Sequence, residues 1–134
     1  RYGSSAASDV YKRQMYNLSP VGEFFYQVCT TTPCMLRGAY KLVDVCKKKI
    51  SEDENEVSKD GKVSWMEVEC LGACINAPMV QINDDYYEDL DANKLEKIID
   101  QTIRGETPKS GSYRGRINSE PENNRKTLMD IKNA

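Results

Sequence analysis

Four cysteines stand in two closely spaced pairs and are the residues best suited to chemistry in this chain. Cys29 and Cys34 lie in the string C-T-T-T-P-C, and Cys70 and Cys74 lie in C-L-G-A-C. The sequence contains no histidine, which excludes zinc sites of the Cys/His kind, Rieske centres, Ser-His-Asp triads and Cys-His nucleophile pairs. Four thiolates in two short loops are therefore expected to bind a metal ion or an iron–sulfur cluster.

The spacing of these cysteines leaves three kinds of site open. C-x4-C combined with C-x3-C lies within the range of structural four-cysteine zinc modules. A thiol–disulfide enzyme is a further alternative, although neither pair has the C-x-x-C spacing of thiol oxidoreductases. The loop composition favours a cluster, because buried cluster charge needs N–H and O–H donors near the sulfurs. Suitable donors and turn-forming residues flank the cysteines, namely Thr30, Thr31, Thr32, Pro33, Gly38, Gly72 and Pro78.

Cys46, the fifth cysteine, is placed outside this set. It shares the apolar face of a predicted helix, and a free cysteine commonly packs as a small hydrophobic residue. The acidic run from Asp84 to Asp91 lacks the glycine and terminal glutamate of an EF-hand loop, so a solvated turn is expected rather than a calcium site. The sequence has no glycine-rich phosphate loop, and it predicts neither a flavin nor a nicotinamide site.

Hydrophobic patterns predict the elements that position the cysteines. Strands are expected at residues 24–28 and 62–69, each leading into a cysteine pair, and a hairpin of residues 78–82 and 86–90 turns at Asn83 to Asp85. A helix follows Cys34, and a last helix is capped by Asp91 and ended by Gly105. The order β-α-β-β-β-α predicts an α/β (α+β) fold, a small sheet flanked by helices, with both pairs at strand exits. The buried faces are expected to carry Leu36, Ala39, Tyr40, Val43, Cys46 and Ile50 on the first helix, and Ala92, Leu95, Ile98, Ile99 and Ile103 on the last.

Charge and composition divide the 134 residues into one domain and two tails. Residues 1–14 are expected to be disordered or artefactual, residues 15–104 to form the domain, and residues 105–134 to be an extended partner-binding or disordered tail. The domain has 10 basic and 16 acidic residues, a net charge of −6, which argues against nucleic acid. No run reads as a membrane span or a signal peptide, so a reducing compartment is expected. Tyr86 and Tyr87 are candidates for a partner surface, and Trp65 for such a surface or the core.

Two strings around the cysteines resemble a known family: V-C-T-T-T-P-C-M-L-R-G, followed by V-E-C-L-G-A-C-I-N-A-P-M-V-Q-I-N-D-D-Y-Y-E-D-L. They are similar to the thioredoxin-like [2Fe-2S] ferredoxin family, and within it to the small flavoprotein subunits of NADH:quinone oxidoreductase, respiratory complex I (the E subunit in bacteria, flavoprotein 2 in mitochondria). The tail string G-S-Y-R-G-R-I-N-S-E-P resembles the C-terminal extension of such subunits. The resemblance implies a thioredoxin-like fold and one [2Fe-2S] cluster bound by Cys29, Cys34, Cys70 and Cys74. Members of the family normally have an N-terminal helical segment before the first cysteine strand, where this sequence has only Met15 to Val21. The sequence is therefore expected either to be a fragment or to lack those helices, which normally contribute to docking with the larger subunit.

The resemblance also implies a function. The chain is expected to be a one-electron carrier, part of an NADH dehydrogenase and not catalytic alone, that exchanges electrons with the FMN of the larger flavoprotein subunit, which also binds NADH. Other peripheral-arm subunits are expected partners, without nucleic acid or direct membrane insertion. The expected location is the cytoplasmic face of the bacterial inner membrane, or the matrix side in mitochondria. The equivalent subunit of an NAD-reducing hydrogenase or formate dehydrogenase is the alternative within this class.

Overall fold

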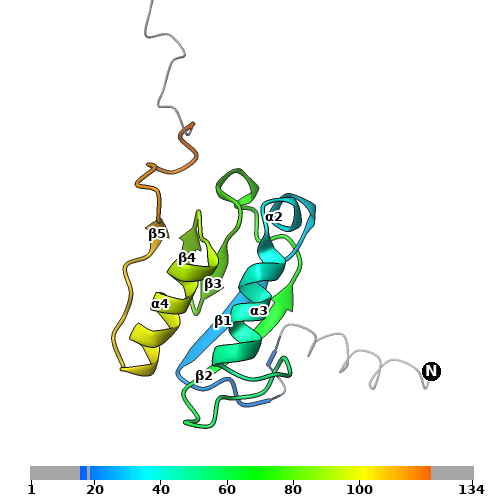
Figure 1. Cartoon of the computed structure of the whole chain (residues 1–134), viewed down its shortest axis with the longest axis vertical. Coiled ribbons are helices and arrows are strands. Elements are labelled where there is room, and N and C mark those ends of the chain that lie inside the picture. Colours follow the sequence, from blue (N-terminus) through cyan, green and yellow to red (C-terminus); the bar gives the residue numbers. More distant parts are fainter. Residues whose placement is uncertain (1–15, 18, 122–134) are drawn as a thin grey trace, which may run out of the picture.

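The computed structural model describes residues 16–17 and 19–121, and these form a five-stranded mixed sheet with helices on one face (Figure 1). The strand order across the sheet is β2-β1-β3-β4-β5. The elements in chain order are β1 (Phe24–Cys29), α2 (Thr32–Leu36), α3 (Ala39–Lys49), β2 (Val63–Val68), the 3-10 helix η1 (Cys74–Asn76), β3 (Val80–Ile82), β4 (Asp85–Glu88), α4 (Ala92–Ile103) and β5 (Gly111–Ser112). The mixed α/β architecture expected from the sequence is confirmed.

Strand pairing brings both cysteine loops to one edge of the sheet. Strands β1 and β2 are parallel, with Phe24 opposite Val63 and Cys29 opposite Val68. Their carboxyl ends therefore meet, and each leads into a cysteine pair. Strand β3 runs antiparallel to β1 and starts at the same edge, with Val80 opposite Val28. Figure 1 accordingly shows α2 and the loop that carries η1 at the same end of the molecule.

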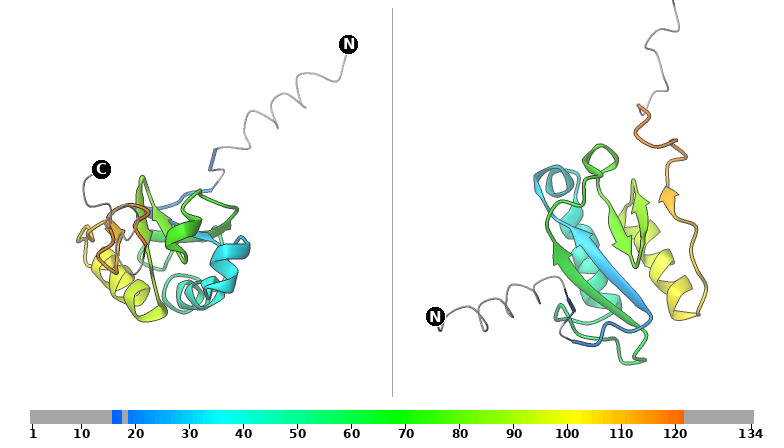
Figure 2. Two further views of the ribbon diagram at one scale, coloured as in Figure 1. Left: turned by 90° about the horizontal axis from the view of Figure 1, so that it is seen from above. Right: turned by 180° about the vertical axis from the view of Figure 1, so that it is seen from behind.

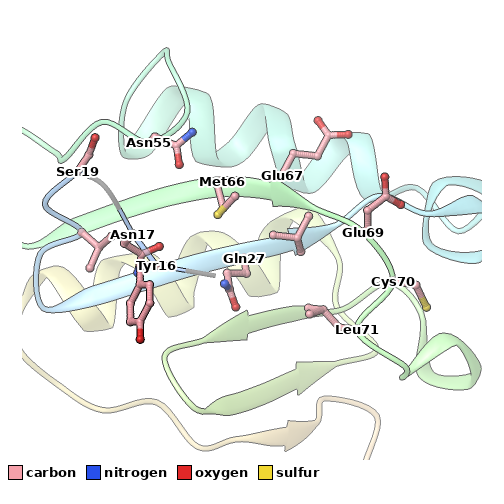
Figure 3. A pocket seen from close by; sticks show the side chains of 12 residues that line it. Tyr16, Asn17, Ser19, Gln27, Asn55, Met66, Glu67, Glu69, Cys70 and Leu71 are labelled. Carbon is pink, nitrogen blue, oxygen red and sulfur yellow. The ribbon is translucent and has the colours of Figure 1, made fainter. Parts of the chain in front are cut away.

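Helices α3 and α4 cover one face of the sheet and bury most of the apolar side chains (Figure 2). The Asp91 carboxylate caps α4, because its Oδ1 accepts a 2.8 Å hydrogen bond from the backbone N–H of Lys94. The buried face of α4 carries Leu95, Ile98 and Ile99, as its 3.6-residue period predicts. On the other face, residues before β1 and side chains of β1 and β2 line an open groove of about 830 Å³ that ends at Cys70 (Figure 3).

The structure divides the predicted first helix into two. Gly38 has φ 96° and separates α2 from α3, which changes the direction of the chain between them. The prediction that Leu36 and Tyr40 are buried is therefore wrong, since they are 77% and 52% exposed. Val43, Cys46 and Ile50 pack in the main core together with Leu42, and Ala39 is buried in a separate small cluster.

Two aromatic predictions are settled by burial. Trp65 and Tyr87 lie in the core, so they belong to no surface. The Trp65 indole N–H donates to the Ser51 carbonyl at 2.9 Å, and the Tyr87 hydroxyl donates to the Pro108 carbonyl at 3.1 Å. Tyr86 remains partly exposed.

The chain after α4 continues along the sheet as far as it is described. Strand β5 adds to β4 in parallel, with Tyr87 opposite Gly111. The acidic run expected to be a solvated turn is not solvated throughout, because Asp89 is buried and pairs with Arg116. Residues 1–14 and 122–134, which carry part of the tail predictions, lie outside the described residues. Within the described residues, none of the helices has the length and apolar character needed to span a bilayer.

Candidate metal centre

Cys29 and Cys34, the first pair, occupy the end of β1 and the short helix α2. Pro33 stands in the first turn of α2, where its fixed φ suits a helix start and its missing N–H costs nothing. Both sulfurs are buried, and the two side chains are hydrogen-bonded to each other. Burial raises the pKa of Cys34 to about 12, with Cys29 adding to the rise and a hydrogen bond from the Met79 backbone opposing it. This pair is a buried dithiol whose charged form needs compensation by a cation.

Cys70 and Cys74, the second pair, lie in the loop between β2 and η1. Gly72 has φ 84°, and this left-handed conformation turns its N–H toward the Cys70 sulfur at 3.4 Å, as expected from the sequence. The Cys70 and Cys74 sulfurs are 3.2 Å apart. The Gly72 N–H and then Cys74 lower the pKa of Cys70, while Cys70 raises the pKa of Cys74. The pair therefore holds one proton tightly and loses the other readily.

The structure gathers the cysteines as two pairs rather than as one compact set of four. Cys74 lies within electrostatic range of both Cys29 and Cys34. Within the described residues, no three Cys, Asp or Glu side chains converge closely enough to hold a single metal ion. A two-iron cluster takes two protein ligands on each iron, so two separate pairs that lie near each other are the donor set that it requires.

Apolar side chains packed beneath the two cysteine loops also suit a two-iron cluster. Cys29 and Cys34 belong to a small buried cluster with Ala39, Ala77 and Met79, separate from the main core. The half-buried side chains of Leu71 and Ala73, from the second loop, pack against it. This apolar cluster excludes water from one side of the sulfurs, and the lower local dielectric strengthens the hydrogen bonds made to them.

The three threonines of the first loop are not equivalent. The Thr30 hydroxyl donates to Glu67 at 2.5 Å rather than to a sulfur, tying the first loop to the end of β2. The buried Thr31 hydroxyl has no hydrogen-bond partner among the described residues. An unpartnered hydroxyl between Cys29 and Cys34 matches the expectation of an O–H donor to cluster sulfur.

Several residues that shape the site were not expected there from the sequence. Glu67 holds Thr30, and the Tyr86 hydroxyl donates to the Leu71 carbonyl at 2.8 Å in the second loop. Asn76, the second residue after Cys74, is buried. Cys46 lies in the main core on α3, outside the group, as predicted.

The sequence matches one protein-family model and several curated relatives. A sequence model of the thioredoxin-like [2Fe-2S] ferredoxins matches residues 8–103. The E subunit of NADH-quinone oxidoreductase from Rickettsia typhi is 59% identical over 89 residues, covering 66% of this chain and 52% of the relative. Its counterpart from Rickettsia bellii, of the same name, is 60% identical over 87 residues, covering 65% of this chain and 52% of the relative. The chain thus spans about half the length of these curated relatives.

Solved structures agree on the fold. The thioredoxin-like [2Fe-2S] ferredoxin of Aquifex aeolicus superposes with a TM-score of 0.53 at 18% identity, covering 66% of this chain and 92% of that one. An NAD+-reducing [NiFe]-hydrogenase in the H2-reduced state matches with a TM-score of 0.58 at 17% identity, covering 68% of this chain and 16% of that one. One [2Fe-2S] cluster, the cofactor expected from the sequence, is the group by which the family is named. This chain belongs to the thioredoxin-like [2Fe-2S] ferredoxin family.

Proposed function

We propose that Cys29, Cys34, Cys70 and Cys74 bind one [2Fe-2S] cluster, and that the chain carries single electrons within the NADH-oxidising module of NADH:quinone oxidoreductase. The observation that supports this most is the meeting of two cysteine pairs at one sheet edge, one pair buried and the other open to solvent. When bound, the cluster supplies one-electron redox chemistry. The loops hold the sulfurs, exclude water on the buried side and donate N–H groups toward them.

The side on which electrons pass follows from burial. Cys29 and Cys34 are enclosed, whereas Cys70 is exposed and Cys74 is half-exposed. A redox partner therefore approaches over the second pair. Exposed apolar side chains frame that end of the molecule, with Met35 and Leu36 on α2 and Ile75 on η1, and such side chains are typical of interface cores.

The proposed partner is the larger flavoprotein subunit, which would bind FMN and NADH and exchange electrons with this chain. Relatives at 59% and 60% identity carry the name of a quinone oxidoreductase subunit, whereas the hydrogenase match at 17% identity supports the fold alone. In this assignment the chain is a subunit of an NADH dehydrogenase and catalyses nothing by itself. Its place would be in the peripheral arm, on the cytoplasmic face of the inner membrane.

The cluster is tested by anaerobic purification of the chain, followed by iron and acid-labile sulfide analysis and EPR after reduction. About two iron and two sulfide per chain, with a rhombic signal, are expected for one [2Fe-2S] cluster. A colourless protein that contains zinc would contradict the proposal, because it would show a structural four-cysteine module.

The partner is tested by mixing the chain with the larger flavoprotein subunit and adding NADH. The cluster signal should appear only in the mixture, and Leu36→Glu should weaken the complex by placing a charge on the apolar rim. Tyr16→Glu is the matched control, because Tyr16 is 71% exposed and lies at the other end of the groove from Cys70 (Figure 3). Equal loss of binding in both variants would argue against docking at this rim.

A further inference from the structure

Arg116 forms a buried ion pair that the proposed electron-carrier function does not use. Its guanidinium donates twice to the Asp89 carboxylate, once from Nε at 2.9 Å and once from Nη2. The Asp89 side chain is 0% exposed and that of Arg116 is 11% exposed. Ser112 also donates to Asp89, at 2.5 Å. A bidentate pair this well buried fixes the position of both partners.

The same guanidinium reaches the loop of the second cysteine pair. Arg116 Nη2 donates to the carbonyl oxygen of Ile75 at 3.3 Å, directly after Cys74 in the chain. Arg116 Nη1 donates to the Glu120 carbonyl at 3.2 Å. One side chain thus joins three segments: the end of β4, the C-terminal segment 111–120 and the cysteine loop.

Asn76 also connects the cysteine loop to β4 and to the C-terminal segment 111–120. Its side-chain Nδ2 donates to Glu88 at 2.6 Å and to the carbonyl of Asn118 at 2.8 Å. Its backbone carbonyl accepts a 2.8 Å hydrogen bond from the N–H of Asp89. Ile75 and Asn76, the two residues after Cys74, are therefore both held by the segment around the Asp89–Arg116 pair.

The loop needs such support because little else holds it. The residues from Cys70 to Ile75 are half-buried or exposed, and only the single turn η1 gives them regular structure. From the other side the loop is held by the Tyr86 hydroxyl on the Leu71 carbonyl. Residues that do not bind the metal can still orient its ligands through hydrogen bonds, and these bonds affect how tightly the metal is held.

We propose that Arg116 is a positioning residue for the second cysteine pair, which it orients through the Ile75 carbonyl from its anchor on Asp89. This inference rests on the proposed cluster site. It assigns a part in cluster retention to the C-terminal segment 111–120, which lies in the region expected from the sequence to be an extended partner-binding or disordered tail.

The test uses the full chain with its cluster, in the variants Arg116→Met, Arg116→Lys and Arg104→Met. Arg104 is the matched control, because its Nε also donates to a backbone carbonyl, that of Asp100, at 3.1 Å, and it is exposed at the C-terminal end of α4. Two readouts report on the cluster: the rate at which a chelator bleaches its visible absorbance, and the EPR g-values after reduction. Far-UV circular dichroism reports on folding.

Arg116→Met should lose the cluster on the order of tenfold faster than the parent chain and shift its g-values, while Arg104→Met matches the parent. Arg116→Lys should restore part of the retention, because lysine keeps the charge without the planar fork. If Arg116→Met does not fold, the double variant Asp89→Asn with Arg116→Met removes the unpaired buried carboxylate and takes its place in the comparison.

Three results would overturn the inference. The first is a bleaching rate and g-values for Arg116→Met, or for the double variant, equal to those of the parent chain. The second is that Arg104→Met accelerates cluster loss as much as Arg116→Met does. A parent chain that binds no iron would instead refute the proposed cluster site itself, and this inference with it, so the two failures are distinguishable.

Discussion

Cys46 provides a quantitative test of which cysteines serve the cluster. It lies on α3 with no exposed surface, among apolar side chains of the main core. Burial raises the pKa of its thiol to about 12, so it stays protonated and is a poor ligand and a poor nucleophile. Replacing Cys46 should therefore change stability and leave the cluster in place.

The two useful substitutions differ in polarity. Cys46→Ser places a hydroxyl in an apolar site, which costs about 1–3 kcal/mol when no hydrogen bond compensates it. Cys46→Val keeps the site apolar but adds one heavy atom to a fully buried site, and such overpacking costs about 1–3 kcal/mol. Both losses are smaller than the roughly 5–15 kcal/mol stability of a typical domain, so both variants should fold.

The assays separate packing from ligation. Urea unfolding gives the stability loss, and iron and sulfide analysis gives cluster content, which should equal that of the parent in both Cys46 variants. Cys34→Ser should lose the cluster, because the second ligand of the buried pair is gone. In the parent, iodoacetamide should leave Cys46 unmodified until the chain unfolds, since at pH 8 a thiol of pKa about 12 is only about 10⁻⁴ thiolate. Loss of iron in Cys46→Ser, with Cys34→Ser intact, would refute this choice of ligands.

Three further predictions concern the scaffold. Asp91→Ala removes the α4 cap and should lower the free energy of unfolding by about 0.5–2 kcal/mol; an unchanged urea midpoint would contradict the cap. Gly22→Ala and Gly61→Ala both force alanine into a left-handed conformation, at φ 74° and 70°, which costs about 1–2 kcal/mol. Gly22→Ala should be the more destabilising in thermal unfolding, because its Cβ would lie 2.5 Å from a backbone carbonyl oxygen, whereas nothing lies within 4 Å at Gly61. Burial alone would raise the pKa of Asp89, but hydrogen bonds from Arg116 and Ser112 hold it below its usual value. The resulting stabilisation is present above the unfolded pKa of about 3.9 and is lost as pH falls through the folded pKa; urea unfolding from about pH 7 to pH 2 should show a steeper acid loss in the parent than in Asp89→Asn.

Sequence patterns over a few neighbouring residues correctly predicted strands β1 and β2, the helix cap and the buried face of α4. Strands β1 and β2, the Asp91 cap and the periodic face of α4 all appear in the structure, because each depends on residues close together in the sequence. The burial expected from alternation does not hold in β1, where Phe25 is buried together with Phe24 and Tyr26. The wrong prediction that Leu36 and Tyr40 are buried also came from a short-range pattern. A 3.6-residue period continues across Gly38 in the sequence, yet the left-handed conformation of that glycine breaks it in space.

Long-range pairing explains what the sequence did not show. Asp89 and Arg116 are 27 positions apart, and nothing in a charged turn or a polar tail indicates that one carboxylate is buried by one arginine. Strand β5 has only two residues, too few for an alternating pattern. The gathering of the cysteines was predictable, because two strands that each lead into a pair need only lie parallel to bring their ends together.

The unequal burial of the two pairs links the fold to the proposed function. A carrier that exchanges single electrons with a flavin must exclude water around its cluster, yet still bring it close to a partner. Strand β1 lies between β2 and β3, so Cys29 at its end is covered by neighbours on both sides, while Cys70 lies in a loop beyond the edge strand β2. Strand order thus contributes to the unequal burial of Cys29 and Cys70, while Cys34 on α2 is buried by its packing against Ala39, Ala77 and Met79. The exposed pair consequently depends on hydrogen bonds from outside its own loop, from Tyr86 and from Arg116.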